Sequence, residues 1–390
     1  MSLFCLLLPF IRIRNWILRK TRKYARLLDD RITLTLRRSR SDFILYARRL
    51  VLKRVKWSKE KEREFDEFWI KNYGRRISPD WHRYYEATTG VFDVGFMPSR
   101  IFSPELLPAL NEMESARFCE AKTNLSLFFD DGRPVRCVPR HYGYKIRDYY
   151  YDGERNIVTK EVLAERLANV GECVFKRAND MQGHGFCFYN FQNGKDVKTG
   201  QTALEILNST QGGFVFQERI YQHSAYAHLS PKSLNTVRIS TFVCEGKVYH
   251  SPIAIRFGVG DSVVDNFHAG GIGIGVSDEG VLNKTGWRSL VHDVFEPCTV
   301  NPNNGELLEG YRVPYMDRII EFAEKNHGKL PGIGVISWDL VVTEEGNPIV
   351  IEVNVSNQNL KFPQYMNGAP FFGEKTDKML HILKKRRPRK

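Results

Sequence analysis

The chain has 390 residues, of which 42% are hydrophobic, and a formal net charge of +13 at pH 7. This length is enough for two or three domains with a sizeable buried core. Its seven cysteines include no Cys-x-x-Cys pair, which argues against a zinc site and a disulfide framework and favours a reducing, cytoplasmic compartment.

The positive charge is concentrated at the two ends of the chain. Residues 1–63 contain 19 Lys and Arg against 5 Asp and Glu, and residues 381–390 are also strongly basic. Basic ends suit an anionic membrane surface or nucleic acid as partner. Nucleic acid is the weaker of the two alternatives, because the body of the chain has no motif that interleaves aromatic and basic residues.

The pattern of residues 43–57 predicts an amphipathic helix with one basic face. Its apolar face is formed by Phe43, Ile44, Ala47, Leu50, Val51, Val55 and Trp57. One interpretation is an in-plane anchor, peripheral at the inner membrane face, and the other is packing of this face on the protein's own core. The preceding apolar residues 1–11 are too few to span a bilayer.

The remaining elements suggest a chain divided into five regions. They are a basic helical segment, a mixed α/β region, a region where strands alternate with shorter helices, a strand-rich region and a basic tail: residues 1–75, 76–170, 171–222, 223–375 and 376–390. We expect a helix at Pro104–Thr123 in the second region and a disordered tail. Because no long low-complexity linker separates the regions, we expect them to pack together.

A lysine and two glycines form the first group with a chemical signal. The segment Cys173–Lys176 predicts a strand that ends in a lysine, and the loop after it contains Gly183 and Gly185. Glycines let the backbone approach phosphates closely, and a nearby lysine neutralises their charge. The alternative is a chance Gly-x-Gly, since the P-loop pattern is absent.

The second group is a predicted strand, Phe214–Ile220, which contains Gln217 and Glu218 at its polar end. The backbone at such a strand end can face an adenine, while the carboxylate reaches the ribose. The alternative interpretation is a glutamate exposed to solvent at the end of an ordinary strand.

Two strand arginines form the third group. Alternation along a predicted strand places Arg238 on one face with Thr236 and Ser240. An arginine at mid-strand needs an anion, either a phosphate or the partner of a structural salt bridge. The second arginine, Arg256, precedes Asn266 and a Gly-Gly pair, a segment that is also consistent with a simple turn.

The segment from Ser337 to Asn354 predicts a β-hairpin that carries Asp339 on its first strand and Glu352 and Asn354 on its second. Residues two apart on a strand share a face, and folding at Thr343–Asn347 brings Asp339 to the same face. Two carboxylates and an amide oxygen suit Mg²⁺, with substrate phosphates completing the octahedron. The alternative is a hairpin whose acidic residues face solvent.

Read in order, these groups resemble the ATP-grasp superfamily. The resemblance covers roughly residues 120–375, and within it the chain is similar to the sugar-transfer-associated branch. The segments that carry this closer resemblance are Gln217–His223, Leu234–Ile239, Val264–Asn266 and Trp338–Leu340. It implies an α+β ATP-grasp fold, in which two α+β subdomains clasp ATP, here with a basic helical N-terminal extension.

The resemblance also implies roles for individual residues. Lys176 and the loop with Gly183 and Gly185 would contact the phosphates of ATP, and Gln217 and Glu218 would lie by the adenosine. The catalytic side chains would be Arg238 and Arg256, near the γ-phosphate, together with Asn266. One or two Mg²⁺ ions would be held by Asp339, Glu352 and Asn354.

The family also uses an earlier lysine, for which Lys145 is the candidate and Arg140 the alternative. A second difference lies after Asn354, where relatives often have an arginine and this chain has Val355–Gln358. This leaves open how the chain binds a substrate carboxylate.

The reaction that the resemblance implies is ligation of a carboxylate to an amine through an acylphosphate, with release of ADP and phosphate. The substrates would be small molecules or glycan precursors of a surface polysaccharide. Two alternatives remain, a kinase-like phosphotransferase of the same fold and a non-catalytic nucleotide-binding scaffold.

Overall fold

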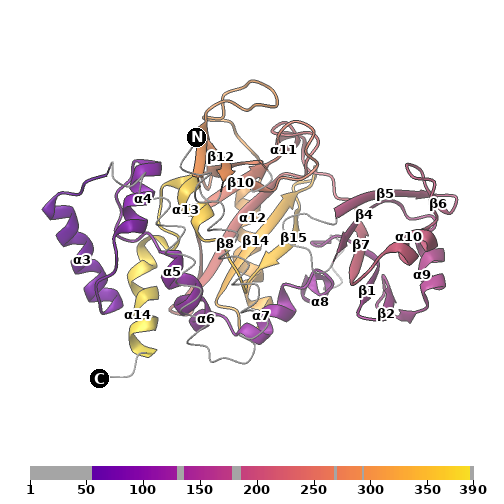
Figure 1. Cartoon of the computed structure of the whole chain (residues 1–390), viewed down its shortest axis with the longest axis horizontal. Coiled ribbons are helices and arrows are strands. Elements are labelled where there is room, and N and C mark those ends of the chain that lie inside the picture. Colours follow the sequence, from indigo (N-terminus) through magenta and orange to yellow (C-terminus); the bar gives the residue numbers. More distant parts are fainter. Residues whose placement is uncertain (1–54, 130–135, 178–185, 268–269, 292–293, 387–390) are drawn as a thin grey trace, which may run out of the picture.

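The computed structural model describes residues 55–129, 136–177, 186–267, 270–291 and 294–386. Two β-sheets organise this part of the chain, and a group of helices covers the end of the larger sheet that is remote from the smaller one (Figure 1). The helices before the first strand are α3 (Lys59–Tyr73), α4 (Asp80–Thr89), α5 (Ser99–Ile101), the π-helical turn η2 (Phe102–Leu106), α6 (Leu107–Leu110), α7 (Met113–Cys119) and α8 (Leu125–Phe129).

The smaller sheet is antiparallel and has seven strands. In spatial order they are β3 (Ile157–Val158), β2 (Tyr149–Asp152), β1 (His141–Ile146), β7 (Phe214–Glu218), β4 (Gly171–Arg177), β5 (Phe186–Gln192) and β6 (Lys195–Asp196). The region boundary expected at residue 171 therefore separates strands of one sheet, because β7 hydrogen-bonds to both β1 and β4.

Two short helices, α9 (Lys160–Leu167) and α10 (Ala203–Ser209), cover one face of this sheet. The Thr159 side chain caps α9, and Thr202 and Glu205 form a capping box at the start of α10. Cys173 and Phe175 of β4 point into the core beneath these helices. Side chains alternate along a strand, so Val174 and Lys176 point to the opposite face.

The larger sheet has eight strands. The path runs β13 (Val294–Cys298), β12 (Leu282–Val291), β11 (Ile272–Val276), β10 (Ile253–Phe257), β8 (Thr236–Cys244), β14 (Val335–Val342) and β15 (Pro348–Asn354), with β9 (Lys247–His250) paired to β8. The predicted hairpin is confirmed as β14 and β15, and its turn is closed by the hydrogen bond from Thr343 N–H to Asn347 O at 3.1 Å.

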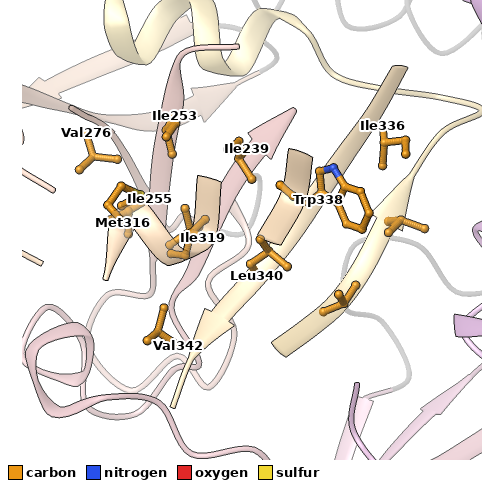
Figure 2. Packing of buried hydrophobic residues seen from close by; sticks show 14 of the residues in the cluster. Ile239, Ile253, Ile255, Val276, Met316, Ile319, Ile336, Trp338, Leu340 and Val342 are labelled. Atoms are coloured by element: carbon orange, nitrogen blue, oxygen red, sulfur yellow. The ribbon is translucent and has the colours of Figure 1, made fainter. Parts of the chain in front are cut away.

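The apolar face of the larger sheet holds the main core, against helix α12 (Met316–Asn326). Figure 2 shows Met316 and Ile319 of α12 next to Ile255 of β10, with Ile239 of β8 and Leu340 and Trp338 of β14 following across the same face. These side chains are fully buried or nearly so. Because this face is apolar, alternation sends the polar residues of the same strands to the opposite face.

The remaining elements are short helices around the larger sheet: α11 (Ser224–Ala227), the 3-10 turns η4 (His327–Lys329) and η5 (Gly373–Lys375), α13 (Lys361–Asn367) and α14 (Thr376–Arg386). No helix in the described ranges is long and apolar enough to cross a membrane. The predicted amphipathic helix 43–57 lies mostly outside the described residues. Its last residue, Trp57, is buried among the core residues of α3 and α14.

Two expectations need correction. The helix expected at Pro104–Thr123 is interrupted, because Asn111 leaves the helix and its side chain hydrogen-bonds to the backbone of Val335 and Val355. The tail expected to be disordered is helical as far as Arg386. Met379, Leu380 and Leu383 of α14 are buried in the same core cluster as residues of α3, which fixes this segment.

Candidate active site

A cavity of about 800 Å³ lies between the two sheets. Lys176 and Glu218 reach it from the smaller sheet, and β8, β10, β14 and β15 supply its wall on the other side. Eight basic side chains and five carboxylates line it, which suits an anionic ligand. The expected site residues that line this cavity are Lys176, Glu218, Arg238, Arg256, Asn266, Asp339, Glu352 and Asn354.

At the centre of the larger sheet's polar face, Arg238 of β8 lies opposite Asp339 of β14. The Arg238 Nε donates to Asp339 Oδ1 at 2.5 Å, and Nη2 donates to Oδ2 at 2.8 Å. Both side chains are buried, so the pair is well shielded from water. The prediction that Arg238 and Ser240 share one face of β8 is also confirmed, since the Ser240 hydroxyl is hydrogen-bonded to that of Ser337 of β14 on this side.

Arg256 of β10 completes a network of charged side chains around Asp339. Its Nη2 lies 3.2 Å from Asp339 Oδ1, and its Nε lies 3.4 Å from Asp265 Oδ2. It also donates to Thr236 Oγ1 at 2.7 Å. Burial alone would raise the pKa of Asp339, but Arg238 and Arg256 outweigh it and hold that pKa below its usual value. Asp339 is therefore an anion in a mostly cationic setting.

Glu352 lies directly opposite Asp339 on the neighbouring strand β15, which confirms the prediction that the two residues share a face of the hairpin. Its side chain is 38% exposed, and its Oε1 lies 3.2 Å from the Nζ of Lys122. Asn354 is the third member of the predicted cluster, and its Nδ2 lies 3.5 Å from Asp339 Oδ2. The structure therefore brings Asp339, Glu352 and Asn354 together on one face of the hairpin.

These three residues offer hard oxygen donors of the kind that Mg²⁺ prefers. The described residues contain no cluster of three or more His, Cys, Asp and Glu placed for a metal. A metal at this hairpin would thus rely on two carboxylates, an amide oxygen and donors from a ligand. The donor set fits Mg²⁺, with Glu352 open to the cavity and Asp339 sharing its oxygens with arginine donors.

Lys176 enters the cavity from β4 of the smaller sheet. Burial lowers its pKa to about 8, with the Glu352 carboxylate opposing this shift and the Lys122 ammonium adding to it. A lysine in this environment gains a compensating charge when an anion binds beside it. The position of Lys176 thus suits a phosphate group held between the two sheets.

The strand β7 places its two polar residues differently. Glu218 lines the cavity and accepts a hydrogen bond from the backbone N–H of Arg140 at 3.1 Å. Gln217 is buried and does not line the cavity; its Nε2 lies 2.9 Å from His141 Nε2. Burial and nearby cations lower the pKa of His141 to about 4, so this imidazole is neutral at pH 7.

The structure does not place Lys145 at the cavity, contrary to expectation. Its Nζ lies 5.0 Å from the ring centroid of Tyr150, its register partner on β2. Tyr150 packs on the core beneath α9 and α10, so strand alternation turns Lys145 to the helix-covered face. The alternative, Arg140, is exposed and does not line the cavity either, and Gly183 and Gly185 lie outside the described residues.

Three charged residues of the α7 region also line the cavity, and no sequence pattern indicates them. Lys122 forms an ion pair with Glu352, and Glu120 Oε1 accepts a hydrogen bond from the Ser356 hydroxyl at 2.6 Å. Arg117 is exposed at the cavity edge. These residues carry no local motif, and their proximity to β15 arises only from tertiary packing.

A family model described as sugar-transfer associated ATP-grasp matches residues 154–378 of the chain. No curated protein matches this chain. The matched range contains all the expected site residues except Lys145, and it does not include Arg117, Glu120 and Lys122.

Three solved structures illustrate the more distant likenesses. VanG D-Ala:D-Ser ligase from Enterococcus faecalis is 12% identical, with 70% of this chain and 63% of that chain covered and a TM-score of 0.39. D-alanyl-alanine synthetase A from Vibrio cholerae is 12% identical, with coverages of 71% and 67% and a TM-score of 0.42.

The third is the biotin carboxylase domain of 2-oxoglutarate carboxylase from Hydrogenobacter thermophilus, described in complex with MgADP, ADP and bicarbonate. It is 11% identical, with coverages of 72% and 49% and a TM-score of 0.36. The chain thus spans about half to two thirds of the length of these proteins. Such distant likenesses transfer neither a substrate nor the role of a residue.

Proposed function

Because this chain belongs to the sugar-transfer associated ATP-grasp family, we propose that it is an ATP- and Mg²⁺-dependent ligase that joins a carboxylate to an amine through an acylphosphate. Family membership confirms the expected α+β ATP-grasp fold, with a helical region ahead of it. The proposal goes further by naming the reaction and the residues that carry it out.

One observation supports the proposal above all others. The same cavity is lined by Lys176 of the smaller sheet and by Arg238 and Arg256 of the larger sheet. The carboxylates of Asp339 and Glu352 line it as well. Cations on both walls can hold the oxygens of a polyphosphate, and the oxygen cluster can hold its divalent ion. This combination is more specific than a basic pocket or an acidic hairpin alone.

The residues have separable roles in this account. Lys176 binds phosphate oxygens, and Glu218 lies at the nucleoside end of the cavity. Arg238 and Arg256 are held in place by Asp339, so their guanidinium groups are oriented before any ligand arrives. Asn266 lines the cavity after β10 and offers an amide to a substrate.

Mg²⁺ would be held by Asp339, Glu352 and Asn354, and when bound it would neutralise charge on the transferring phosphoryl group. The arginines contribute in the same sense by stabilising negative charge on the equatorial oxygens. An oxygen of the substrate carboxylate attacks the γ-phosphorus while the bond to the β-phosphate oxygen breaks, and ADP leaves. This step needs no nucleophile from the protein.

The second step joins the two substrates. The amine nitrogen attacks the carbonyl carbon of the acylphosphate, inorganic phosphate leaves with the bonding electron pair, and the nitrogen loses a proton. In line with the family's description we propose that the substrates belong to surface polysaccharide or glycan precursors. The basic N-terminal segment fits an enzyme that works at the inner face of a membrane.

The reaction class can be tested without knowing the amine. Hydroxylamine captures acylphosphates as hydroxamates, so a screen of carboxylates with ATP, Mg²⁺ and hydroxylamine should give a hydroxamate and ADP. Stable phosphate on a hydroxyl would instead support the phosphotransferase alternative. Glu352→Ala should abolish the Mg²⁺-dependent turnover, whereas Glu344→Ala, in the exposed turn of the same hairpin, should not.

A further inference from the structure

The Glu352 carboxylate already has a cation beside it, supplied by the chain itself. The Lys122 Nζ lies 3.2 Å from Glu352 Oε1, and the Lys122 side chain is only 19% exposed. Lys122 belongs to the segment between α7 and α8, ahead of the range that the family model matches. The pair thus joins the N-terminal helical region to the expected metal position.

This lysine is presented by an anchored piece of backbone. Glu120, two residues earlier, accepts hydrogen bonds from the N–H of Ser356 at 3.1 Å and from its hydroxyl at 2.6 Å. Its Oε2 also lies 3.5 Å from the N–H of Val355. The segment is therefore fixed at the end of β15, and Lys122 reaches Glu352 from a defined position.

The other carboxylate of the cluster is compensated differently. Asp339 has Arg238 and Arg256 beside it, and both remain in place because strands β8 and β10 hold them. Glu352 forms its ion pair with Lys122, whose flexible side chain can turn away from it, while Lys176 and Arg256 also attract its charge. A divalent cation and an ammonium cannot occupy the same carboxylate oxygens, because their charges repel at this distance.

We propose that Lys122 is a built-in counter-ion that occupies Glu352 in the metal-free protein and is displaced when Mg²⁺ binds with the nucleotide. The inference rests on the proposed function, since it assumes that Glu352 is a metal ligand. Its consequence is that the protein alone holds Mg²⁺ weakly. Metal binding must then draw on the phosphates of the nucleotide.

Calorimetric titration of ADP at a series of Mg²⁺ concentrations tests this directly. ADP is the probe because it lacks the γ-phosphate, which a displaced Lys122 could contact. Lys122→Met should lower the Mg²⁺ concentration for half-maximal ADP binding about threefold, the effect of removing a partly exposed ion pair. Lys122→Arg keeps a competing cation and should behave as the wild type does.

Two controls separate this effect from a general change in charge. Lys378→Met removes an ion pair away from the cavity, the one between Lys378 and Glu245, and should leave the Mg²⁺ requirement unchanged. In a Glu352→Gln background, Lys122→Met should have no further effect. An unchanged or higher Mg²⁺ requirement in Lys122→Met would overturn the inference. Failure of the wild type to bind ADP with Mg²⁺ would instead contradict the proposed function.

Discussion

Arg238 and Asp339 face each other across β8 and β14, and two hydrogen bonds of 2.5 and 2.8 Å join the guanidinium to the carboxylate. The pair lies at the bottom of the cavity, between the apolar core on one side of the sheet and the ligand space on the other. It therefore has two functions, since it balances a buried charge and orients an arginine toward the cavity.

The first prediction concerns the stability of this pair. Arg238→Met leaves the buried Asp339 with one arginine fewer and should lower the free energy of unfolding by about 3 kcal/mol. Urea denaturation measures the change. The double variant Arg238→Met with Asp339→Asn should regain part of the loss, because it removes the uncompensated charge. Unfolding at an unchanged urea concentration in Arg238→Met would show that the pair does not stabilise the fold.

The second prediction concerns pH. The folded-state pKa of Lys176 is about 8, below its ordinary value, so the side chain is cationic below pH 8 and neutral above it. Nucleotide affinity should therefore fall as the pH rises from 7 to 9, because the phosphates lose a positive partner. Lys176→Arg should bind without this decline, since arginine stays charged. Calorimetry at several pH values measures both, and a matching decline in Lys176→Arg would assign it to another group.

The lowered pKa of Lys176 also makes the free energy of unfolding depend on pH. The folded state releases its proton at a lower pH than the unfolded state, so between the two pKa values the unfolded state binds more protons. The contribution of Lys176 to the free energy of unfolding should therefore rise with pH above about 8. Comparing the wild type with Lys176→Met over this pH range isolates that contribution.

The hairpin illustrates what could be predicted from the sequence. Two alternating strands joined by Thr343–Asn347 fix which residues share a face, so Asp339, Glu352 and Asn354 were grouped correctly. The same argument could not place Lys145. Alternation defines two faces of β1, but only tertiary packing of α9 and α10 decides which of them is covered.

Contacts between segments that are far apart along the chain could not be predicted from the sequence. Lys122 and Glu352 are far apart along the chain, and nothing in the α7 region predicts its approach to β15. The expected disorder of the tail is wrong for a related reason. Met379, Leu380 and Leu383 occur at the helical spacing that buries them against α3.

The third prediction follows from this burial of α14. Leu380 is fully buried, so Leu380→Ala should lower the free energy of unfolding by about 3 kcal/mol through lost contacts and a residual cavity. Thermal or urea unfolding measures the change. Lys385→Ala is the matched control on the exposed face of the same helix. Equal stability of the two variants would contradict the packing of α14.

The fourth prediction concerns the basic N-terminal segment. The full chain should co-sediment with vesicles that contain phosphatidylglycerol at low salt and be released by moderate salt. A chain that begins at residue 55 should remain in the supernatant. The truncation stops there because Trp57 is part of the core. Equal sedimentation of both chains would locate any membrane contact elsewhere.

The cavity between the two sheets should bind ATP together with Mg²⁺ at the β14–β15 hairpin. Calorimetric titration with a non-hydrolysable ATP analogue measures this, with and without Mg²⁺, in the wild type and in Glu352→Ala. We expect that binding is stronger with Mg²⁺ and that Glu352→Ala removes this Mg²⁺ dependence. Binding that is equally strong without Mg²⁺, or a Mg²⁺ dependence that survives in Glu352→Ala, would contradict it.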